Sequence, residues 1–302
     1  LSVLMLTGLR EIAIITTPHD RPSFERLLGD GSQWGIALTF IEQPRPDGLA
    51  QAYLLAEDFL AGAPSMLILG DNLFYGSGFI PLLERVAARE EGGTIFAYKV
   101  ADPRAYGVVE FDADKRVIGI EEKPKHPRSK YAVPGIYFFD GRAPAIARQV
   151  RPSARVELEI TPVMEAYRAA GELLVEVIQR GIAWLDTGTH DLLTEASEFI
   201  RIIEKRQGLK VGCIEEVAYR MGFIDRHQLL QLAETMAKSD YGPYLRDILE
   251  EQVGGSSGTC ARASGDPARG PPAPITVTVM PEVAIGEPHA FLLGSPRSGT
   301  TW

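Results

Sequence analysis

Residues 65–78 read SMLILGDNLFYGSG, and this stretch decides the fold into which the rest of the chain must fit. Residues 66–69 form an apolar run without a charge, which stops at Gly70, Asp71 and Asn72. Such a run is typical of a central strand of a parallel sheet, buried on both faces, although a buried helix segment can show the same pattern. The short length of the run and the glycines that flank it favour the strand.

Asp71 directly follows this predicted strand. Open α/β sheets bind their ligands in the crevice at the carboxyl ends of the strands, and Gly70 would let the backbone approach a ligand closely. We therefore predict that Asp71 is a functional residue. The plainer alternative is that Asp71 caps the helix after the loop.

The composition is that of an ordinary globular chain. Of the 302 residues, 45% are hydrophobic and 24% are charged, which predicts one large domain or two smaller ones. The net charge of -9 argues against a nucleic acid or an anionic membrane as the main partner. Cys213 and Cys260 are the only cysteines, and no apolar stretch reaches membrane-spanning length, so we expect a cytoplasmic protein without a disulfide framework.

Strand and helix signals alternate along the first hundred residues. The predicted strands cover residues 11–17, 36–42, 66–69 and 94–100, and the predicted helices between them cover 22–28, 49–60 and 79–90. This alternation predicts an α/β fold with a doubly wound, mostly parallel sheet that has helices on both faces.

The pattern changes after residue 100. An antiparallel hairpin is predicted over residues 108–112 and 117–121, and a strand over 131–140, so the sheet should be mixed and carry an inserted lobe. A helix over 158–169 and a strand over 173–179 follow. Residues 192–204, 214–221, 225–237 and 243–251 predict C-terminal helices, as a small bundle or an oligomer contact.

Three predicted strand-end loops carry acidic residues or glycines, namely QPRPDG (43–48), GDN (70–72) and DTG (186–188). In a doubly wound sheet these loops share one rim, so Asp71 and Asp186 could meet across a cleft. Two carboxylates without a neighbouring His or Cys form the oxygen ligand set that Mg²⁺ prefers. The sequence thus predicts a magnesium site.

Glu122 and Lys123 end another predicted strand. A lysine offers a point charge to a phosphate, and a carboxylate offers an acceptor to hydroxyl groups. The alternative for this pair is a solvated charge cluster.

Seven motifs in order give a resemblance to a known family. They are LLGDGSQWGI (27–36), QPRPDGLAQA (43–52), LGDNLFYG (69–76), YGVVEFD (106–112), IEEKP (120–124), ELEIT (157–161) and WLDTGTHD (184–191). Residues 1–251 resemble the sugar-nucleotidyltransferases. The resemblance implies transfer of a deoxythymidylyl group from dTTP to glucose 1-phosphate, giving dTDP-glucose for dTDP-rhamnose and surface polysaccharides, by a homo-oligomer that is a tetramer in the family.

The resemblance also implies a role for each matching position. Asp71 and Asp186 would hold Mg²⁺ and, with Lys123, form the catalytic set. The implied substrate contacts are Gln43 and Gly48 to the base, Asn72 and Gly107 to the sugar side, Glu122 to the sugar hydroxyls, Lys123 to the sugar phosphate, Val133 through its backbone, and Arg155 to a phosphate. Arg155 could instead be a surface residue of its loop.

The ends of the chain depart from the family pattern. The chain begins at Leu1 inside a predicted helix, and the glycine-rich loop of the family would precede it, so we expect a domain that lacks its first strand and is inactive as given. Pro162 stands where relatives carry Asp. A non-catalytic nucleotide-sugar binding paralogue, a uridylyltransferase or another metal-dependent sugar-nucleotide enzyme remain alternatives.

The composition changes again at Gln252. Residues 252–274 are rich in Gly, Ser, Pro and Ala, which predicts a flexible, disordered linker. After it, FLLGSPRSGTTW (291–302) resembles the first strand and phosphate-binding loop of a sulfotransferase. We expect residues 275–302 to begin a truncated sulfotransferase-like domain and assign no sulfotransferase activity to it.

Overall fold

The structure is a computed structural model that describes residues 1–254, apart from residues 46 and 154. The last described helix, α11 (Tyr241–Gly254), runs three residues past the predicted domain end at residue 251. The rest of the predicted linker and the sulfotransferase-like segment lie outside the described residues.

The first strands form where the apolar runs predicted them. β1 (Glu11–Thr16) pairs in parallel with β2 (Ala37–Glu42), and every residue of β3 (Ser65–Ile68) is buried. An apolar run without alternation is stable as a strand only when both of its faces are covered. The prediction of a strand at residues 66–69 is confirmed for 66–68. Its predicted central place in a parallel sheet is wrong, because within the described residues β3 lies at the end of its sheet and pairs antiparallel with β9 (Ile136–Phe139).

The largest sheet is mixed, as predicted, but parallel pairing does not dominate it. Its order is β3-β9-β5-β8-β6-β7, with β10 beside β5. Its further strands are β5 (Gly93–Lys99), β6 (Gly107–Phe111), β7 (Val117–Glu122), β8 (Tyr131–Ala132), β9 (Ile136–Phe139) and β10 (Leu173–Val177). β10 is parallel to β5, whereas β9 is antiparallel to both β3 and β5.

The expectation of a mostly parallel sheet is therefore wrong for this part of the chain. β8 and β9 continue one another along β5 and both run antiparallel to it, because the chain passes out through the inserted lobe and returns beside β5 without a crossover helix. The single strand predicted over 131–140 is two strands, β8 and β9, with Pro134 between them, a residue that cannot donate to a sheet.

Two strands were not predicted at all. β4 (Asn72–Gly76) and β11 (Ile182–Asp186) form an antiparallel pair in which Asp186 lies opposite Asn72. Gly76 is required in this pair, because a Cβ atom there would lie 2.1 Å from the carbonyl oxygen of Gly181. The sequence interpretation took these residues for loops.

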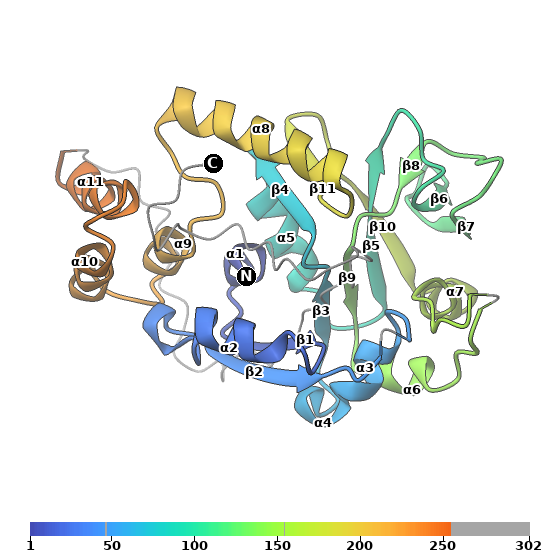
Figure 1. Ribbon diagram of the computed structural model, residues 1–302. Coiled ribbons are helices and arrows are strands. Elements are labelled where there is room, and N and C mark those ends of the chain that lie inside the picture. The colour runs from blue at the N-terminus through green and yellow to red at the C-terminus, as the bar shows by residue number, and fades with distance from the viewer. Residues whose placement is uncertain (46, 154, 255–302) are drawn as a thin grey trace.

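Helices cover both sides of the central strands, as predicted (Figure 1). α5 (Phe79–Ala87) lies on one side of β3, β9 and β5 and α7 (Thr161–Ala169) on the other. The remaining helices of this region are α1 (Ser2–Leu6), α2 (Arg21–Leu28), η1 (Ser32–Trp34), α3 (Gln51–Leu55), α4 (Glu57–Leu60) and α6 (Ala143–Ala147). The helix predicted over 49–60 is thus divided between α3 and α4, and α6 was not predicted.

Three of the four C-terminal helices form a small bundle, which confirms that expectation for residues 214–251, whereas the helix predicted over 192–204 packs on β11. α8 (His190–Gln207) runs along the top of Figure 1, and α9 (Ile214–Arg220), α10 (Arg226–Thr235) and α11 pack against one another. Leu229, Leu245 and Ile248 form the buried centre of this bundle.

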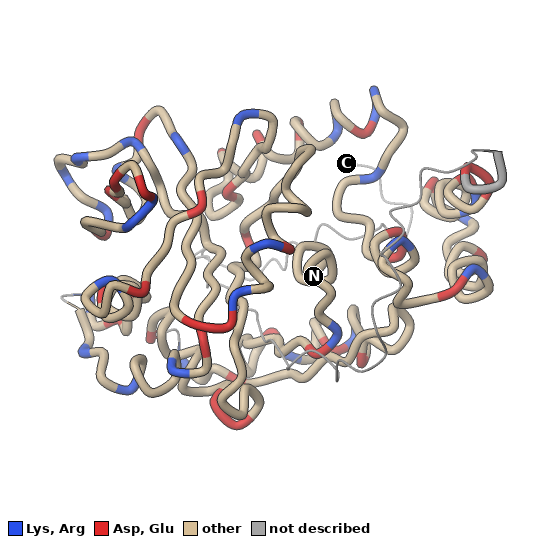
Figure 2. Tube along the Cα trace, turned by 180° about the vertical axis from the view of Figure 1, so that it is seen from behind, with Lys and Arg blue, Asp and Glu red and all other residues tan. Residues whose placement is uncertain are grey.

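No helix within the described ranges is long and apolar enough to cross a membrane. Lys and Arg positions are interspersed with Asp and Glu over many elements rather than gathered on one of them (Figure 2).

Candidate active site

Asp71 and Asp186 lie together at the ends of their strands. The backbone N–H and the hydroxyl of Thr187 both donate to the carbonyl oxygen of Asp71, each at 2.9 Å. A Cβ atom on Gly188 would lie 3.1 Å from Asp186 Oδ1 and 3.4 Å from Asp71 Oδ2. The two carboxylate oxygens are therefore no farther apart than the sum of these distances, and a glycine at position 188 keeps the space between them open.

The electrostatics of this pair favour a cation. Burial and the nearby charge of Asp186 raise the pKa of Asp71, because both effects disfavour a second negative charge there. A divalent ion would relieve this repulsion. The described residues hold no group of three or more His, Cys, Asp and Glu side chains that could bind a metal. Two carboxylates are a donor set that could hold Mg²⁺, an ion that commonly takes one or two protein carboxylates and completes its shell with water and phosphate oxygens.

Asn72 is buried beside the carboxylate pair. Its Nδ2 donates to Asp71 Oδ1 at 2.6 Å, and its Oδ1 accepts from Trp184 Nε1 at 2.5 Å and from the backbone N–H of Gly135 at 3.2 Å. The side chain is thus engaged with protein groups, and its predicted contact to the sugar side stays a prediction.

Gly107, Glu122 and Val133, which were predicted as substrate contacts, meet in the inserted lobe, whereas Asn72 lies beside the carboxylate pair. Gly107 and Glu122 are paired across β6 and β7, and the N–H of Val133 donates to the carbonyl oxygen of Gly107 at 2.8 Å. A Cβ atom on Gly107 would approach Glu122 Oε2 to 3.4 Å. Thr161, which was not predicted as a site residue, donates its hydroxyl to the same Oε2 at 3.1 Å. The Val133 N–H is used inside the protein, which leaves its carbonyl oxygen for a ligand.

Lys123 and Arg155 supply the positive charge of this region. Lys123 is exposed and has a φ angle of +43°, a left-handed conformation that is costly for a residue with a Cβ atom. Arg155 forms ion pairs with Glu159 at 2.7 Å and with Glu122 at 3.5 Å. Arg155 therefore lies beside the predicted sugar-binding carboxylate rather than isolated on the surface.

Gln43 and Gly48, predicted for the base, are in contact. Gln43 is buried, and its Nε2 donates to Gln51 Oε1 at 2.6 Å and to the carbonyl oxygen of Gly48 at 3.4 Å. Gly48 has a φ angle of +109°, and a Cβ atom there would lie 2.4 Å from the backbone nitrogen of Leu158. The glycine is thus required by the close approach of the Leu158 backbone, a contact that the sequence did not indicate.

Aromatic side chains connect the sugar side with the carboxylate pair. The ring of Trp184 contacts that of Tyr106 with centroids 5.0 Å apart, and the carbonyl oxygen of Tyr106 accepts from the N–H of Lys123. Burial raises the pKa of Tyr137, and the charges of Glu122 and Asp71 act in the same direction. Trp184 was missed as a site residue, although it stands two residues before Asp186 and so shares its face of a strand.

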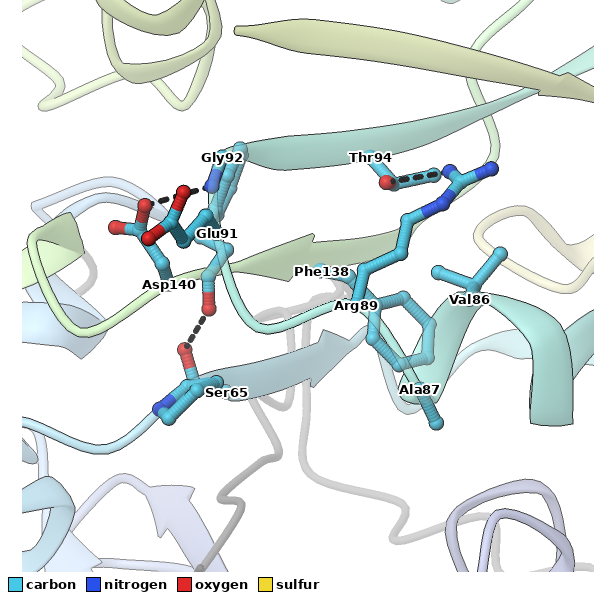
Figure 3. Close-up of a pocket in the computed structure, with 11 residues that line it drawn as sticks. Ser65, Val86, Ala87, Arg89, Glu91, Gly92, Thr94, Phe138 and Asp140 are labelled. Carbon is cyan, nitrogen blue, oxygen red and sulfur yellow. Dashed lines mark hydrogen bonds between the residues drawn. The ribbon is translucent and has the colours of Figure 1, made fainter.

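A separate small cavity lies at the opposite end of the sheet (Figure 3). It is lined by Ser65, Arg89, Gly92, Thr94 and Asp140 and has a volume of about 20 Å³. Arg89 donates to Thr94, and Asp140 accepts from the N–H of Gly92, so these polar groups already have partners. Such a volume holds about one water molecule, and the cavity is not a substrate site.

Comparisons with known proteins agree with this geometry. The family model of nucleotidyl transferases matches residues 1–202. A glucose-1-phosphate thymidylyltransferase of Xanthomonas campestris pv. campestris is 55% identical over 245 residues, which are 81% of this chain and 83% of that protein. A glucose-1-phosphate thymidylyltransferase of Mycolicibacterium smegmatis is 54% identical over 252 residues, covering 83% of this chain and 87% of that one.

Solved structures show the same likeness. A Bacillus anthracis protein assigned as a glucose-1-phosphate thymidylyltransferase, in complex with sucrose, superposes with a TM-score of 0.61 at 35% identity over 66% of this chain and 80% of that one. A UDP-glucose pyrophosphorylase in complex with UDP-glucose gives a TM-score of 0.57 at 20% identity, over 66% and 83% of the two chains, and shares the fold alone.

Proposed function

This chain belongs to the nucleotidyl transferase family and, within it, to the glucose-1-phosphate thymidylyltransferases, and from this premise we propose that it transfers a deoxythymidylyl group from dTTP to glucose 1-phosphate. The products are dTDP-glucose and pyrophosphate. The observation that carries the proposal is the meeting of Asp71 and Asp186 at the ends of their strands. The ring of Trp184, which is hydrogen-bonded to the neighbouring Asn72, contacts that of Tyr106 at the start of the cluster of Gly107 and Glu122. Transfer from a nucleotide to a sugar phosphate needs both a carboxylate pair that can hold a metal ion and a group that binds the sugar hydroxyls.

Transfer occurs by direct attack of a phosphate oxygen of glucose 1-phosphate on the α-phosphorus of dTTP. A new phosphorus–oxygen bond forms as the bond between the α-phosphorus and the bridging oxygen of the pyrophosphate breaks, without a covalent enzyme intermediate. Because no side chain acts as nucleophile, the enzyme contributes positioning and charge stabilisation. Lys123 holds the phosphate of the sugar with its exposed ammonium group.

Asp71 and Asp186 are the residues that would hold Mg²⁺. The bound ion would supply positive charge to the phosphate oxygens of the nucleotide. Burial and the fixed backbone around Thr187 keep the two carboxylates in place before the ligand arrives.

Recognition of the sugar and the base rests on the two remaining clusters. Glu122 accepts hydrogen bonds from sugar hydroxyls while Thr161 and Arg155 fix its orientation. At the base, Gln51 engages the Nε2 of Gln43, so the Gln43 Oε1 is left to accept the N3–H of thymine. Uracil carries the same N3–H, and the preference for thymine is supported by the relatives rather than by this contact.

Pyrophosphate release from dTTP and glucose 1-phosphate tests the proposal. Asp71→Asn should reduce turnover at least about 100-fold, because it removes a charge that acts on the transferred phosphate. Asp58→Asn, at an exposed position of α4, should leave the turnover unchanged. Faster turnover with UTP than with dTTP would favour a uridylyltransferase. Binding of dTDP-glucose without turnover would favour a binding paralogue, or the inactivity that we expect from a chain without the glycine-rich loop of the family.

We also propose that the protein is a homo-oligomer, a tetramer, since it belongs to a family in which we expect that assembly. Light scattering on the eluate of a size-exclusion column measures the mass directly, and a monomer mass would contradict the proposal.

A further inference from the structure

Asn72 stands in the middle of a short hydrogen-bonded chain between Trp184 and Asp71. The indole N–H of Trp184 donates to Asn72 Oδ1 at 2.5 Å, and Asn72 Nδ2 donates to Asp71 Oδ1 at 2.6 Å. The backbone N–H of Gly135 donates to the same Asn72 Oδ1 at 3.2 Å. Because both of these neighbours are donors, the oxygen of the amide must face them, and the NH₂ group must face Asp71.

This arrangement fixes the two oxygens of Asp71 differently. Oδ1 accepts the hydrogen bond from Asn72, whereas Oδ2 is the oxygen that lies toward Gly188 and Asp186. On the other side, Asp186 Oδ1 accepts from the backbone N–H of Gly188 at 2.9 Å. Each carboxylate is therefore held by one hydrogen bond next to the space that they share.

Trp184 is itself held firmly. It lies on β11 two residues before Asp186, and its ring contacts those of Tyr98 and Tyr106 with centroids 5.6 Å and 5.0 Å away. Position 135 must be a glycine beside Asn72, because a Cβ atom there would lie 2.9 Å from Asn72 Nδ2. The indole N–H is thus placed in advance where it can orient the amide.

We propose that Trp184 is a positioning residue for the metal site. Its N–H, acting through Asn72, holds Asp71 with Oδ2 turned toward the space shared with Asp186. This inference rests on the proposed function in one respect, that the carboxylate pair binds a divalent cation. Without the indole N–H, the amide of Asn72 loses a donor and can rotate, and Asp71 can turn away from Asp186.

The variant Trp184→Phe tests the proposal, because phenylalanine keeps an aromatic ring but has no N–H. Free Mn²⁺, measured by electron paramagnetic resonance during a titration of the protein, gives the affinity without an activity assay. We expect about five- to ten-fold weaker Mn²⁺ binding by Trp184→Phe, the effect of losing one hydrogen bond of ordinary strength. An affinity equal to that of the unmodified protein would overturn the proposal.

Trp34→Phe is the matched control. The N–H of Trp34 also donates to an oxygen, Glu215 Oε1 at 3.1 Å, but this contact joins η1 to α9, away from the carboxylate pair. Its Mn²⁺ affinity should equal that of the unmodified protein. An equal loss of affinity in both variants would mean a general loss of stability and would overturn the specific role of Trp184.

A second measurement needs no change at position 184. The chain has three tryptophans, and ¹⁵N-labelled indole groups give one NMR signal each, which Trp34→Phe and Trp302→Phe assign by elimination. Saturating Mg²⁺ should move the Trp184 signal and leave the Trp34 signal in place. An unmoved Trp184 signal contradicts the proposal even if Trp184→Phe does not fold.

The failure of this inference and that of the proposed function can be told apart. If the unmodified protein releases no pyrophosphate but its Mn²⁺ affinity depends on Trp184, the proposed function fails and the positioning role stands. If it releases pyrophosphate and Trp184→Phe binds Mn²⁺ normally, the positioning role fails and the function stands.

Discussion

Thr187 donates two hydrogen bonds to the carbonyl oxygen of Asp71, one from its backbone N–H and one from its hydroxyl, each at 2.9 Å. These bonds join the loop after β11 to the turn before β4. The backbone, rather than the acidic side chains, therefore brings the two carboxylates together.

Asp186→Asn should accordingly leave the fold intact. The substitution removes a like charge from the neighbourhood of Asp71, so the free energy of unfolding without metal should stay equal or rise slightly. Urea unfolding monitored by circular dichroism measures this quantity, and Mn²⁺ binding should be lost in the same variant. A clear loss of stability would show that the Asp186 side chain, through Gly188, holds the loop together.

The stability of the metal-free protein should depend on pH through Asp71. Burial and the charge of Asp186 raise the pKa of Asp71 above its ordinary value of 3.8, so the folded state binds the proton more tightly than the unfolded state. The stabilisation is present below the ordinary pKa and is lost as the pH rises through the raised pKa. Urea unfolding over a pH series should show this decline in the unmodified protein and a smaller one in Asp71→Asn.

Two outcomes would contradict this pH prediction. The first is that the stability of Asp71→Asn depends on pH as that of the unmodified protein does. The second is that saturating Mg²⁺ does not reduce the decline in stability. Either result would mean that other groups cause the decline. Asp58→Asn, at an exposed site, is the control and should follow the unmodified protein.

Lys123→Met should weaken the binding of glucose 1-phosphate. The loss of the ammonium group removes a charge-assisted contact to phosphate, so the KM for glucose 1-phosphate should rise about ten-fold or more while the KM for dTTP changes little. Steady-state kinetics with each substrate varied in turn measure both constants. Lys125→Met, in the same exposed loop, should change neither, and an equal rise in that variant would indicate only the general charge of the loop.

Glu176→Gln should destabilise the protein. Burial acts to raise the pKa of Glu176, but the hydrogen bond from Arg89 and the charges of Lys115, Arg89 and Arg85 outweigh it and lower the pKa. The carboxylate is almost fully buried and pairs with Arg89 at 2.6 Å. Loss of this charge should cost about 1.5–3 kcal/mol of unfolding free energy, as is usual for hydrogen bonds to charged groups.

Urea unfolding near neutral pH checks the value for Glu176→Gln. The control is Glu198→Gln on α8, whose ion pair with Arg201 is exposed and spans 3.7 Å, and it should cost less than about 0.5 kcal/mol. The difference between the two variants should shrink as the pH falls through the lowered pKa of Glu176, because the stabilisation by a carboxylate with a lowered pKa is lost there.

The elements whose signals are local were predictable. The apolar run at 66–69 and the strand at 11–17 are recognisable from their hydrophobic pattern, because burial on both faces selects apolar residues at successive positions. The strand at 36–42 was predicted as well, although no residue of β2 is buried. Asp71 was predicted as an acidic residue directly after a predicted strand, whereas Asp186 was predicted from its loop, because β11, which it ends, was not predicted. Their roles and those of Gln43, Gly107, Val133 and Arg155 required the resemblance to a family.

What only the tertiary structure decided is which segments meet. Trp184 and Asn72 are 112 positions apart, and their hydrogen bond depends on the pairing of β4 with β11, which no local pattern indicates. Likewise, the sequence of residues 136–139 predicts a strand but neither its direction nor its place between β3 and β5. The side chains of a strand depend on whether its faces are buried, so burial can be predicted from the sequence. The pairing of strands is made by backbone hydrogen bonds, and these are the same for every residue type except proline. The sequence therefore indicates very little about which strands pair.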